Sequence, residues 1–240
     1  MPHFQASLAG MKIHTPHSHR PALTALCGLF LLLAQPLASA PVWAEGQAAP
    51  KAAKLSEAEK KDVARIETAL NEMKSVAADF LQINDQGTMR HGTIAIERPG
   101  KMRVTYDAPD KDFIVADGSM VHMWDDEMGQ QTSVPVGEGI ASFILRDHIK
   151  LSGDVVLTRF ARFPAKLEVT LVSVKEPEEG QLTLIFEDKP LKLRQWRVVD
   201  AQGRTTGVNL ENAREDVSFP DSTFTFVSPN LGKSPNAPKR

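Results

Sequence analysis

A change in the spacing of apolar residues at Gly92 constrains this fold more than any other feature of the sequence. From there to Val227, apolar and polar residues alternate and turn residues recur at short intervals, the pattern of half-buried strands joined by hairpins. So many hairpin-linked strands predict one large antiparallel sheet, which must curl or close as strands are added. We predict strands over residues 92–98, 102–106, 112–116, 119–124, 154–160, 166–174, 181–187, 191–199, 205–214 and 222–227.

Two other segments have helical spacing. Ser56 and Glu59 form a capping box, which satisfies free backbone donors and predicts a helix start. One long helix is predicted to follow, with an apolar stripe at steps of three or four made of Val63, Ile66, Leu70, Met73, Ala77 and Phe80. A short second helix is predicted within residues 139–150, with one face formed by Ile140, Phe143, Ile144 and His148.

The apolar faces of both helices need a partner surface, and the sheet is the surface available. A curled sheet with helices across its open side holds either a filled core or a lined cavity. The sequence pattern alone leaves both interpretations open.

The ends of the chain have the composition of targeting and linker segments. Lys12 and Arg20 precede an apolar run from Ala22 to Leu33, and two cleavage patterns follow, ending at Ala40 and, as we favour, at Ala44, which is typical of a secretory signal. The run is shorter than the roughly 20 residues that cross a bilayer. We predict a signal peptide over residues 1–44, a flexible lead-in over 45–54, the working domain over 55–230 and a Pro-rich tail over 231–240.

Composition excludes several classes of function. Cys27 is the only cysteine and lies in the predicted leader, so the mature chain has no disulfide, thiolate nucleophile or Cys-based metal site. Loss of the leader leaves 26 basic and 30 acidic residues, a net charge of −4, whereas nucleic acid calls for a basic surface. Hydrolase, zinc-protease and phosphate-loop motifs are missing, and the carboxylates in residues 124–127 fit a solvated turn better than a cation site. We predict no enzyme activity, no metal and no cofactor.

One charge interrupts the strand pattern. In TIAIERPGKMRVTY, residues 93–106, counting by twos from Ile94 through Ile96 reaches Arg98, which places an arginine on the apolar face. Either its stem packs on apolar neighbours while its head reaches water, or the guanidinium is buried and needs acceptors. The last turn of a covering helix has free carbonyl oxygens, which the five donors of an arginine could bind to hold a lid shut.

Four stretches carry a family resemblance: GTIAIERPGKMRVTYDAP at 92–109, FIVADGSMVHMWDDEMGQQTSVPV at 113–136, ASFIL at 141–145 and TFTFVSP at 223–229. In this order and spacing they resemble the LolA family of periplasmic outer-membrane lipoprotein carriers. The resemblance implies an α+β fold, an incomplete antiparallel β-barrel of about 11 strands with a helical lid over an apolar cavity. It places the protein in the periplasm after cleavage near Ala44.

The resemblance also implies a function and partners. Family members accept the acyl chains of lipoproteins from an ATP-driven inner-membrane transporter, LolCDE, and deliver them to an outer-membrane receptor, LolB. For this chain we expect acylated lipoproteins, a LolCDE-like transporter and, where one exists, a LolB-like receptor as partners, no nucleic acid, and a monomeric state. The family's lid-locking arginine precedes the hairpin proline, the position of Arg98 here. The alternative is a lipid-sensing periplasmic regulatory or binding module with the same barrel.

The resemblance implies that the interior wall binds acyl chains. Strand phase places Ile94, Ile96, Met102, Val104, Tyr106, Val121 and Met123 in this wall, and the predicted helices add Phe80 and Phe143 or Ile144. The opposite phase for residues 119–124, with Met120, His122 and Trp124 facing inward, stays open. A family aromatic is replaced by Val104, with Tyr106 two residues later on the same face. The chain is methionine-rich, which suits a cavity that adapts to variable chains, through Met73, Met89, Met102, Met120, Met123 and Met128.

Overall fold

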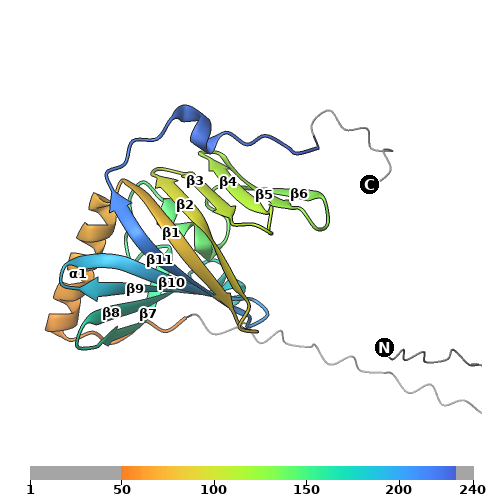
Figure 1. Cartoon of the computed structure of the whole chain (residues 1–240). Helices are drawn as coiled ribbons and strands as arrows, with labels where there is room; N and C mark the ends of the chain where they lie inside the picture. Colours follow the sequence, from red (N-terminus) through yellow and green to blue (C-terminus); the bar gives the residue numbers. More distant parts are fainter. Residues whose placement is uncertain (1–49, 231–240) are drawn as a thin grey trace, which may run out of the picture. The chain divides into compact units, whose positions relative to one another are not determined.

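The computed structural model of the chain describes residues 50–230, in which one α-helix is followed by eleven β-strands and three short 3-10 helices (Figure 1). The helix is α1 (Glu57–Glu72), and the 3-10 helices are η1 (Ile140–Leu145), η2 (Pro177–Glu179) and η3 (Asp221–Phe224). The strands are β1 (Ser75–Asn84), β2 (Met89–Glu97), β3 (Lys101–Tyr106), β4 (Phe113–Asp117), β5 (Met120–Asp125), β6 (Gln130–Pro135), β7 (Val155–Arg162), β8 (Lys166–Ser173), β9 (Gly180–Asp188), β10 (Leu191–Asp200) and β11 (Thr205–Glu215).

Some predicted segments lie outside the described residues: the signal peptide, the first half of the lead-in and the Pro-rich tail. Within residues 50–230, no helix combines the length and the apolar character needed to cross a bilayer.

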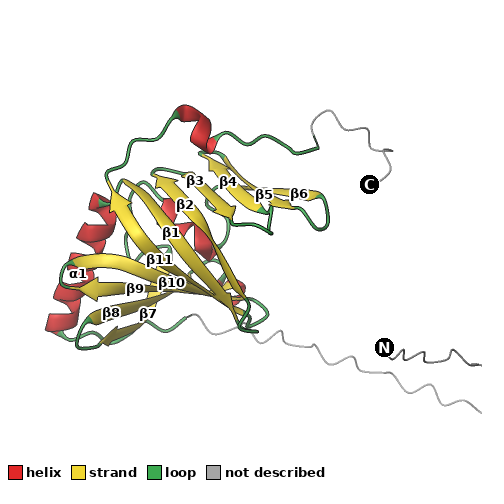
Figure 2. Cartoon of the chain, in the orientation of Figure 1, coloured by secondary structure: helices red, strands yellow, loops and turns green. Residues whose placement is uncertain are grey.

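The strands form one antiparallel sheet in the order β6-β5-β4-β3-β2-β1-β11-β10-β9-β8-β7. The pairing of β1 with β11 joins the first six strands to the last five. Because β6 and β7 are the edges, the sheet stays open, and Figure 2 shows its strong twist with α1 along one side. The predicted incomplete barrel with a helix is therefore confirmed.

The first helix begins as predicted and ends earlier. The Ser56–Glu59 capping box is present, and Ile66 and Leu70 are buried against the sheet. The helix ends at Glu72, however, so the predicted continuation through Ala77 to Phe80 is wrong and this stretch is β1. The stretch fits both periods, and pairing with β2 on one side and β11 on the other favours the strand.

Three further predictions need correction. Strand β6 was missed, because its sequence QQTSVP has little apolar character. The strand predicted at 222–227 is instead η3 followed by irregular chain. The predicted helix within 139–150 is the shorter 3-10 helix η1, and His148 is exposed beyond its end rather than on the buried face.

One contiguous apolar cluster joins α1, η1 and one face of the sheet, which we call the inner face. It spans both halves of the sheet, from Ile96 on β2 to Leu184 on β9. Phe143 of η1 is a member of this cluster and is 0% exposed. Of the two interpretations left open by the sequence, the structure shows a packed, closed interior.

Candidate functional site

Arg98 lies in the turn between β2 and β3, and its side chain is buried, with 7% of the residue exposed. Its Nε donates a hydrogen bond to the carbonyl oxygen of Met73 at 2.9 Å, and Nη1 donates to the carbonyl oxygen of Arg146 at 3.3 Å. Its Nη2 donates to the carbonyl oxygens of Leu70 and Met73. The head of this side chain is therefore bound to protein rather than to water.

These acceptors belong to the ends of two separate elements. Leu70 and Met73 belong to the last turn of α1, where carbonyl oxygens have no partner within the helix, and Arg146 follows η1. The backbone adds two bonds at the same place, from Arg98 N–H to Lys74 O and from Gly100 N–H to Leu145 O, both at 2.8 Å. A single turn of the sheet therefore holds the C-terminal ends of both α1 and η1.

The charge of Arg98 is balanced mainly by backbone dipoles. Within residues 50–230, no carboxylate forms a salt bridge with it, and the last turn of α1 contains no basic residue of its own. Burial lowers the pKa of Arg98 from its ordinary value, and the nearby Asp147 opposes this effect. Because these carbonyls are its acceptors, breaking the contacts leaves the guanidinium unpaired unless it reaches water.

The cross-strand register places the predicted wall residues on one face. Ile94 lies opposite Val104, and Ile96 lies opposite Met102 in the β2–β3 pair. The members that are buried in the apolar cluster are Phe80, Ile94, Ile96, Val104, Phe143 and Ile144, while Met102, Tyr106 and Val121 pack against it. Phe80 comes from β1, not from a helix as predicted.

The contacts of β5 show which of its residues face the interior. Val121 packs against the interior cluster, whereas the ring of the next residue, His122, stacks on Phe226 with centroids 4.5 Å apart. The alternative phase, with His122 facing inward, is therefore wrong. Met123 lies on the inner side opposite Ile114 and is 37% exposed.

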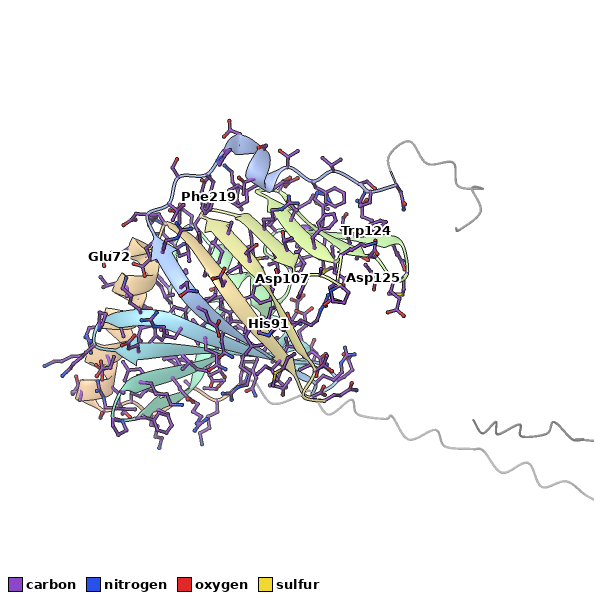
Figure 3. The ribbon with its side chains drawn as sticks, viewed as in Figure 1. Glu72, His91, Asp107, Trp124, Asp125 and Phe219 are labelled. Carbon is purple, nitrogen blue, oxygen red and sulfur yellow. The ribbon has the colours of Figure 1, made fainter. Side chains whose placement is uncertain are left out.

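Met123 borders a cleft of about 270 Å³ at the rim of the interior, lined also by Tyr106, Ile114 and Met128. Trp124 and Asp125 also line this cleft, and Figure 3 shows them at the end of the sheet that is far from Glu72 of α1. Met128 is 64% exposed, so the expectation that the methionines line the interior fails for it, as it does for Met89.

Sequence reasoning missed the polar residues around Tyr106. Its hydroxyl donates to Gln82 Oε1 at 2.9 Å, and the guanidinium of Arg90 lies 3.7 Å from its ring centroid. Arg90 also binds Asp110 and Asp112, and although burial lowers its pKa, these two hydrogen bonds outweigh it and raise the pKa. Gln82 follows Phe80 by two residues, so the two lie on the same face of a strand. Recognising β1 as a strand would therefore have placed Gln82 beside Tyr106.

The family model described as outer membrane lipoprotein carrier protein LolA matches residues 71–227, well over half of the chain. The chain belongs to the LolA family. An outer-membrane lipoprotein carrier protein of Chromobacterium violaceum is 25% identical over 200 residues, covering 81% of this chain and 93% of the relative. Another, from Pseudomonas entomophila, is 25% identical over 192 residues, covering 72% and 86%.

Among solved structures, the LolA superfamily protein NE2245 from Nitrosomonas europaea covers 68% of this chain and 97% of its own. The TM-score is 0.40 at 9% identity, too low to support a statement about function.

The opposite face of the sheet in this LolA family member carries a different cover. Residues 217–230, which we call the C-terminal strap, run from the end of β11 across to the β5–β6 side (Figure 1). Phe224 is 4% exposed and packs edge-on against Phe219, while Arg103 Nη1 donates to Thr223 O at 3.3 Å. The inner face and the β3–β5 part of the outer face are thus covered by unrelated segments.

Proposed function

We propose that this protein carries lipoproteins through the periplasm, accepting their acyl chains at the inner membrane and delivering them to the outer membrane. The observation that carries the proposal is Arg98, a buried cation that closes α1 and η1 over an otherwise apolar interior. Membership of the LolA family and the names of its relatives, outer-membrane lipoprotein carrier proteins, support the same role.

The interior matches the requirement of such a cargo. Each acyl methylene removed from water is worth about 0.8 kcal/mol, so a multiply acylated protein needs an apolar shelter in transit. The wall residues Phe80, Ile94, Ile96 and Val104 offer that surface once the cover moves, and Phe143 adds an apolar ring on the cover itself. Met102, Tyr106, Val121 and Met123 extend the wall towards the rim cleft.

Binding and release follow from competition for the same space. The packed interior leaves acyl chains no room while Arg98 holds α1 and η1 closed, so loading requires these contacts to break. On release, the Arg98 bonds and the apolar contacts of α1 and η1 form again. A bound chain and a closed cover therefore exclude each other, and reclosure favours delivery without a nucleotide.

The partners follow from this route. We infer loading from a LolCDE-like transporter in the inner membrane and delivery to a LolB-like receptor where one exists, with the signal peptide 1–44 directing export. The carrier does no covalent chemistry in this scheme, since its task is to bind and to release.

Replacing Arg98 tests the role of the closing contact. Arg98→Leu is expected to keep lipoprotein binding and to slow delivery to acceptor membranes at least tenfold, because reclosure no longer recovers the Arg98 bonds. The assay follows transfer of a labelled lipoprotein from purified carrier to acceptor vesicles. Arg159→Leu, which removes an exposed arginine of β7, is the matched control. Delivery by Arg98→Leu at the normal rate would contradict the closing role.

Purification from the native periplasm tests the cargo itself. The protein is expected to co-purify with triacylated lipoprotein, detected by mass spectrometry. Protein that is empty and bound to a membrane signalling protein would instead support the lipid-sensing regulatory module.

A further inference from the structure

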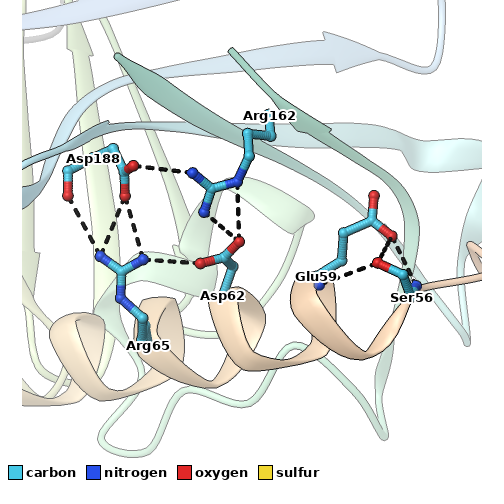
Figure 4. Close-up of polar contacts among 6 residues, drawn as sticks. All are labelled: Ser56, Glu59, Asp62, Arg65, Arg162 and Asp188. Carbon is cyan, nitrogen blue, oxygen red and sulfur yellow. Dashed lines mark hydrogen bonds and ion pairs between the residues drawn. The ribbon is translucent and has the colours of Figure 1, made fainter. Parts of the chain in front are cut away.

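Two clusters of arginines and aspartates lie apart from Arg98, and the first is fully paired. It contains Asp62 and Arg65 of α1, Arg162 at the end of β7 and Asp188 at the end of β9 (Figure 4). Arg65 Nη1 lies 2.8 Å from Asp62 Oδ1, and Arg65 Nη2 lies 3.2 Å from Asp188 Oδ1. Arg162 Nη1 lies 3.0 Å from Asp188 Oδ2, and Arg162 Nε and Nη2 bind Asp62 Oδ2. The charges balance and every carboxylate oxygen has a partner, so this cluster joins α1 to the sheet and leaves no acceptor for a ligand.

The second cluster surrounds Arg90 of β2 and is not fully paired. Arg90 Nε donates to Asp110 Oδ2 at 2.8 Å, and Nη2 donates to Asp112 Oδ2 at 2.7 Å. The guanidinium also lies over the ring of Tyr106. Within residues 50–230, no hydrogen bond engages Arg90 Nη1. Two carboxylates and one ring therefore orient this side chain, and a donor remains available to a ligand.

Arg90 lines the rim cleft of about 270 Å³. The residues that line this cleft come from β2 to β6 and the turns between them, and none of them belongs to α1 or η1. The cleft is therefore accessible with the cover of the interior in place. Its walls are mainly apolar and its polar groups are few, which is the usual character of a ligand site.

An apolar row of side chains connects the cleft with the interior. In the cross-strand register, Ile94 lies opposite Val104, and Val104 lies opposite Ile114. Ile114 in turn lies opposite Met123. Ile94 and Val104 are buried, Ile114 is half-buried and Met123 is exposed. The row spans three strand spacings, about 14 Å, so one apolar wall extends from the closed interior into the cleft.

The charges at the cleft disfavour an anionic ligand. Arg90 supplies one positive charge, while three carboxylates line the cleft or bind Arg90, namely those of Asp110, Asp112 and Asp125. The ammonium of Lys111 lies 4.0 Å from Asp126, which offsets its charge. A phosphate or carboxylate beside Arg90 would meet an excess of negative charge, whereas an uncharged carbonyl oxygen can accept from Nη1 without that repulsion.

We propose that the rim cleft is a selectivity site for the acylated cysteine of a lipoprotein, where Arg90 donates to an ester or amide carbonyl and the surrounding carboxylates exclude fatty acids and phospholipids. The acyl chain lies along Ile114 and Met123, and the flexible side chain of Met128 adds an adaptable contact. The lipoprotein as ligand rests on the proposed function, whereas the preference for a neutral carbonyl does not. A carrier that loads at a membrane thereby rejects the charged lipids around its cargo.

Methyl laurate and laurate, which share one acyl chain, test the preference at neutral pH. The full chain is isotope-labelled at its methionine methyl groups, and their NMR signals are followed during titration with each ligand below the concentration at which it aggregates. Met123 and Met128 report on the cleft, whereas Met73, buried in the apolar cluster, reports on the interior. We expect methyl laurate to shift the signals of Met123 and Met128 but not of Met73, and to bind at least tenfold more tightly than laurate.

Asp110→Asn combined with Asp112→Asn tests the role of the carboxylates. Arg90 then carries an unbalanced positive charge, so we expect the preference for methyl laurate over laurate to fall at least fivefold. The matched control is Glu178→Gln combined with Glu211→Gln, which removes the same charge from exposed residues outside the cleft lining. A preference that falls equally in both double variants would show that the carboxylates beside Arg90 do not set it.

Arg90→Leu tests the donor, with dodecyl methyl ether as a ligand that lacks the carbonyl. We expect methyl laurate to lose at least fivefold in affinity and to bind no more tightly than the ether, whose affinity stays unchanged. Arg90→Lys, which keeps a cationic donor, is expected to restore part of the preference for the ester. An ester preference that survives Arg90→Leu would contradict the role of Arg90.

The outcomes for the two ligands separate this proposal from the carrier function. Equal affinity for laurate and methyl laurate, or a shift of Met73 without Met123, would overturn the selectivity site. A protein that prefers the ester but purifies from the periplasm without lipoprotein would retain the site and contradict the carrier function. A protein that purifies with lipoprotein but does not prefer the ester would contradict the selectivity site alone.

Discussion

The inner face of the sheet and the outer face of β3 to β5 are both covered, but by different means. The inner face is closed by α1 and η1, whose C-terminal ends meet at the single side chain of Arg98. The outer face of β3 to β5 is covered by the C-terminal strap through aromatic contacts, among them His122 with Phe226 and Phe113 with Phe226. The inner cover is thus regular structure whose ends meet at the Arg98 turn, whereas the outer cover is irregular chain around the short helix η3 with contacts spread along it.

This difference assigns separate roles to the faces. A cover that leaves as a unit can expose a continuous apolar wall, and the inner face has one that spans both halves of the sheet. The strap shields a smaller apolar area around Val115, which is buried but lies apart from the interior cluster. We therefore expect changes on the inner face to affect cargo, and changes on the outer face to affect stability alone.

The largest effect is expected at Phe143, a fully buried member of the inner cluster. Phe143→Ala removes a ring that is 0% exposed and should lower the free energy of unfolding by about 3–5 kcal/mol, measured by urea denaturation. It should also weaken binding of a triacylated lipopeptide, because the ring belongs to the predicted wall. Unchanged lipopeptide affinity in folded protein would remove Phe143 from the cargo site.

A smaller effect is expected on the outer face. Phe224→Ala should lower the free energy of unfolding by about 1–3 kcal/mol, because the strap can detach locally without opening the interior. Lipopeptide affinity should equal that of the unchanged protein. A loss of affinity comparable to that of Phe143→Ala would show that the faces do not divide stability from cargo binding.

The smallest effect is expected at Asp117, the last residue of β4. Its carboxylate accepts hydrogen bonds from Met120 N–H and Ser119 N–H, both at 2.8 Å, and lies 3.3 Å from His122 Nε2. These bonds, first that of Met120, hold the pKa of Asp117 well below its ordinary value.

Because the folded pKa lies below the unfolded value of about 4, the stabilisation is complete at neutral pH and is lost as the pH falls below about 4. Asp117→Asn should therefore lower the urea midpoint slightly at pH 7, with the difference shrinking towards pH 3. A difference that stays constant between pH 7 and pH 3 would show that the charge of Asp117 has no such effect.

The sequence was sufficient for the elements whose pattern fits one period only. The capping box located the start of α1, and the alternation from Gly92 onward located β2 to β5 and β7 to β11. Arg98 was singled out because it breaks that alternation.

The errors fall where local pattern and tertiary pairing compete. Residues 77–80 fit a helix as well as a strand. They form β1 because this segment pairs with β2 on one side and with β11 on the other, and β11 is distant in sequence. Residues 222–227 alternate like a strand, yet their aromatic rings pack onto the outer face instead of extending the sheet edge. The hydrogen-bond partners of Asn71 and Arg65, which are Ile149 and Asp188, lie 78 and 123 residues away, beyond the range of any local pattern.

The division between the faces is tested most directly at two neighbouring residues of β5. Val121 packs against the interior cluster, and His122 stacks on the strap. A photo-crosslinking amino acid is placed at one position or the other, and the carrier is loaded with a triacylated lipopeptide before illumination. We expect labelling of the acyl chains from position 121 and none from position 122. Labelling from position 122 alone, or equally from both, would contradict an acyl-chain site on the inner face.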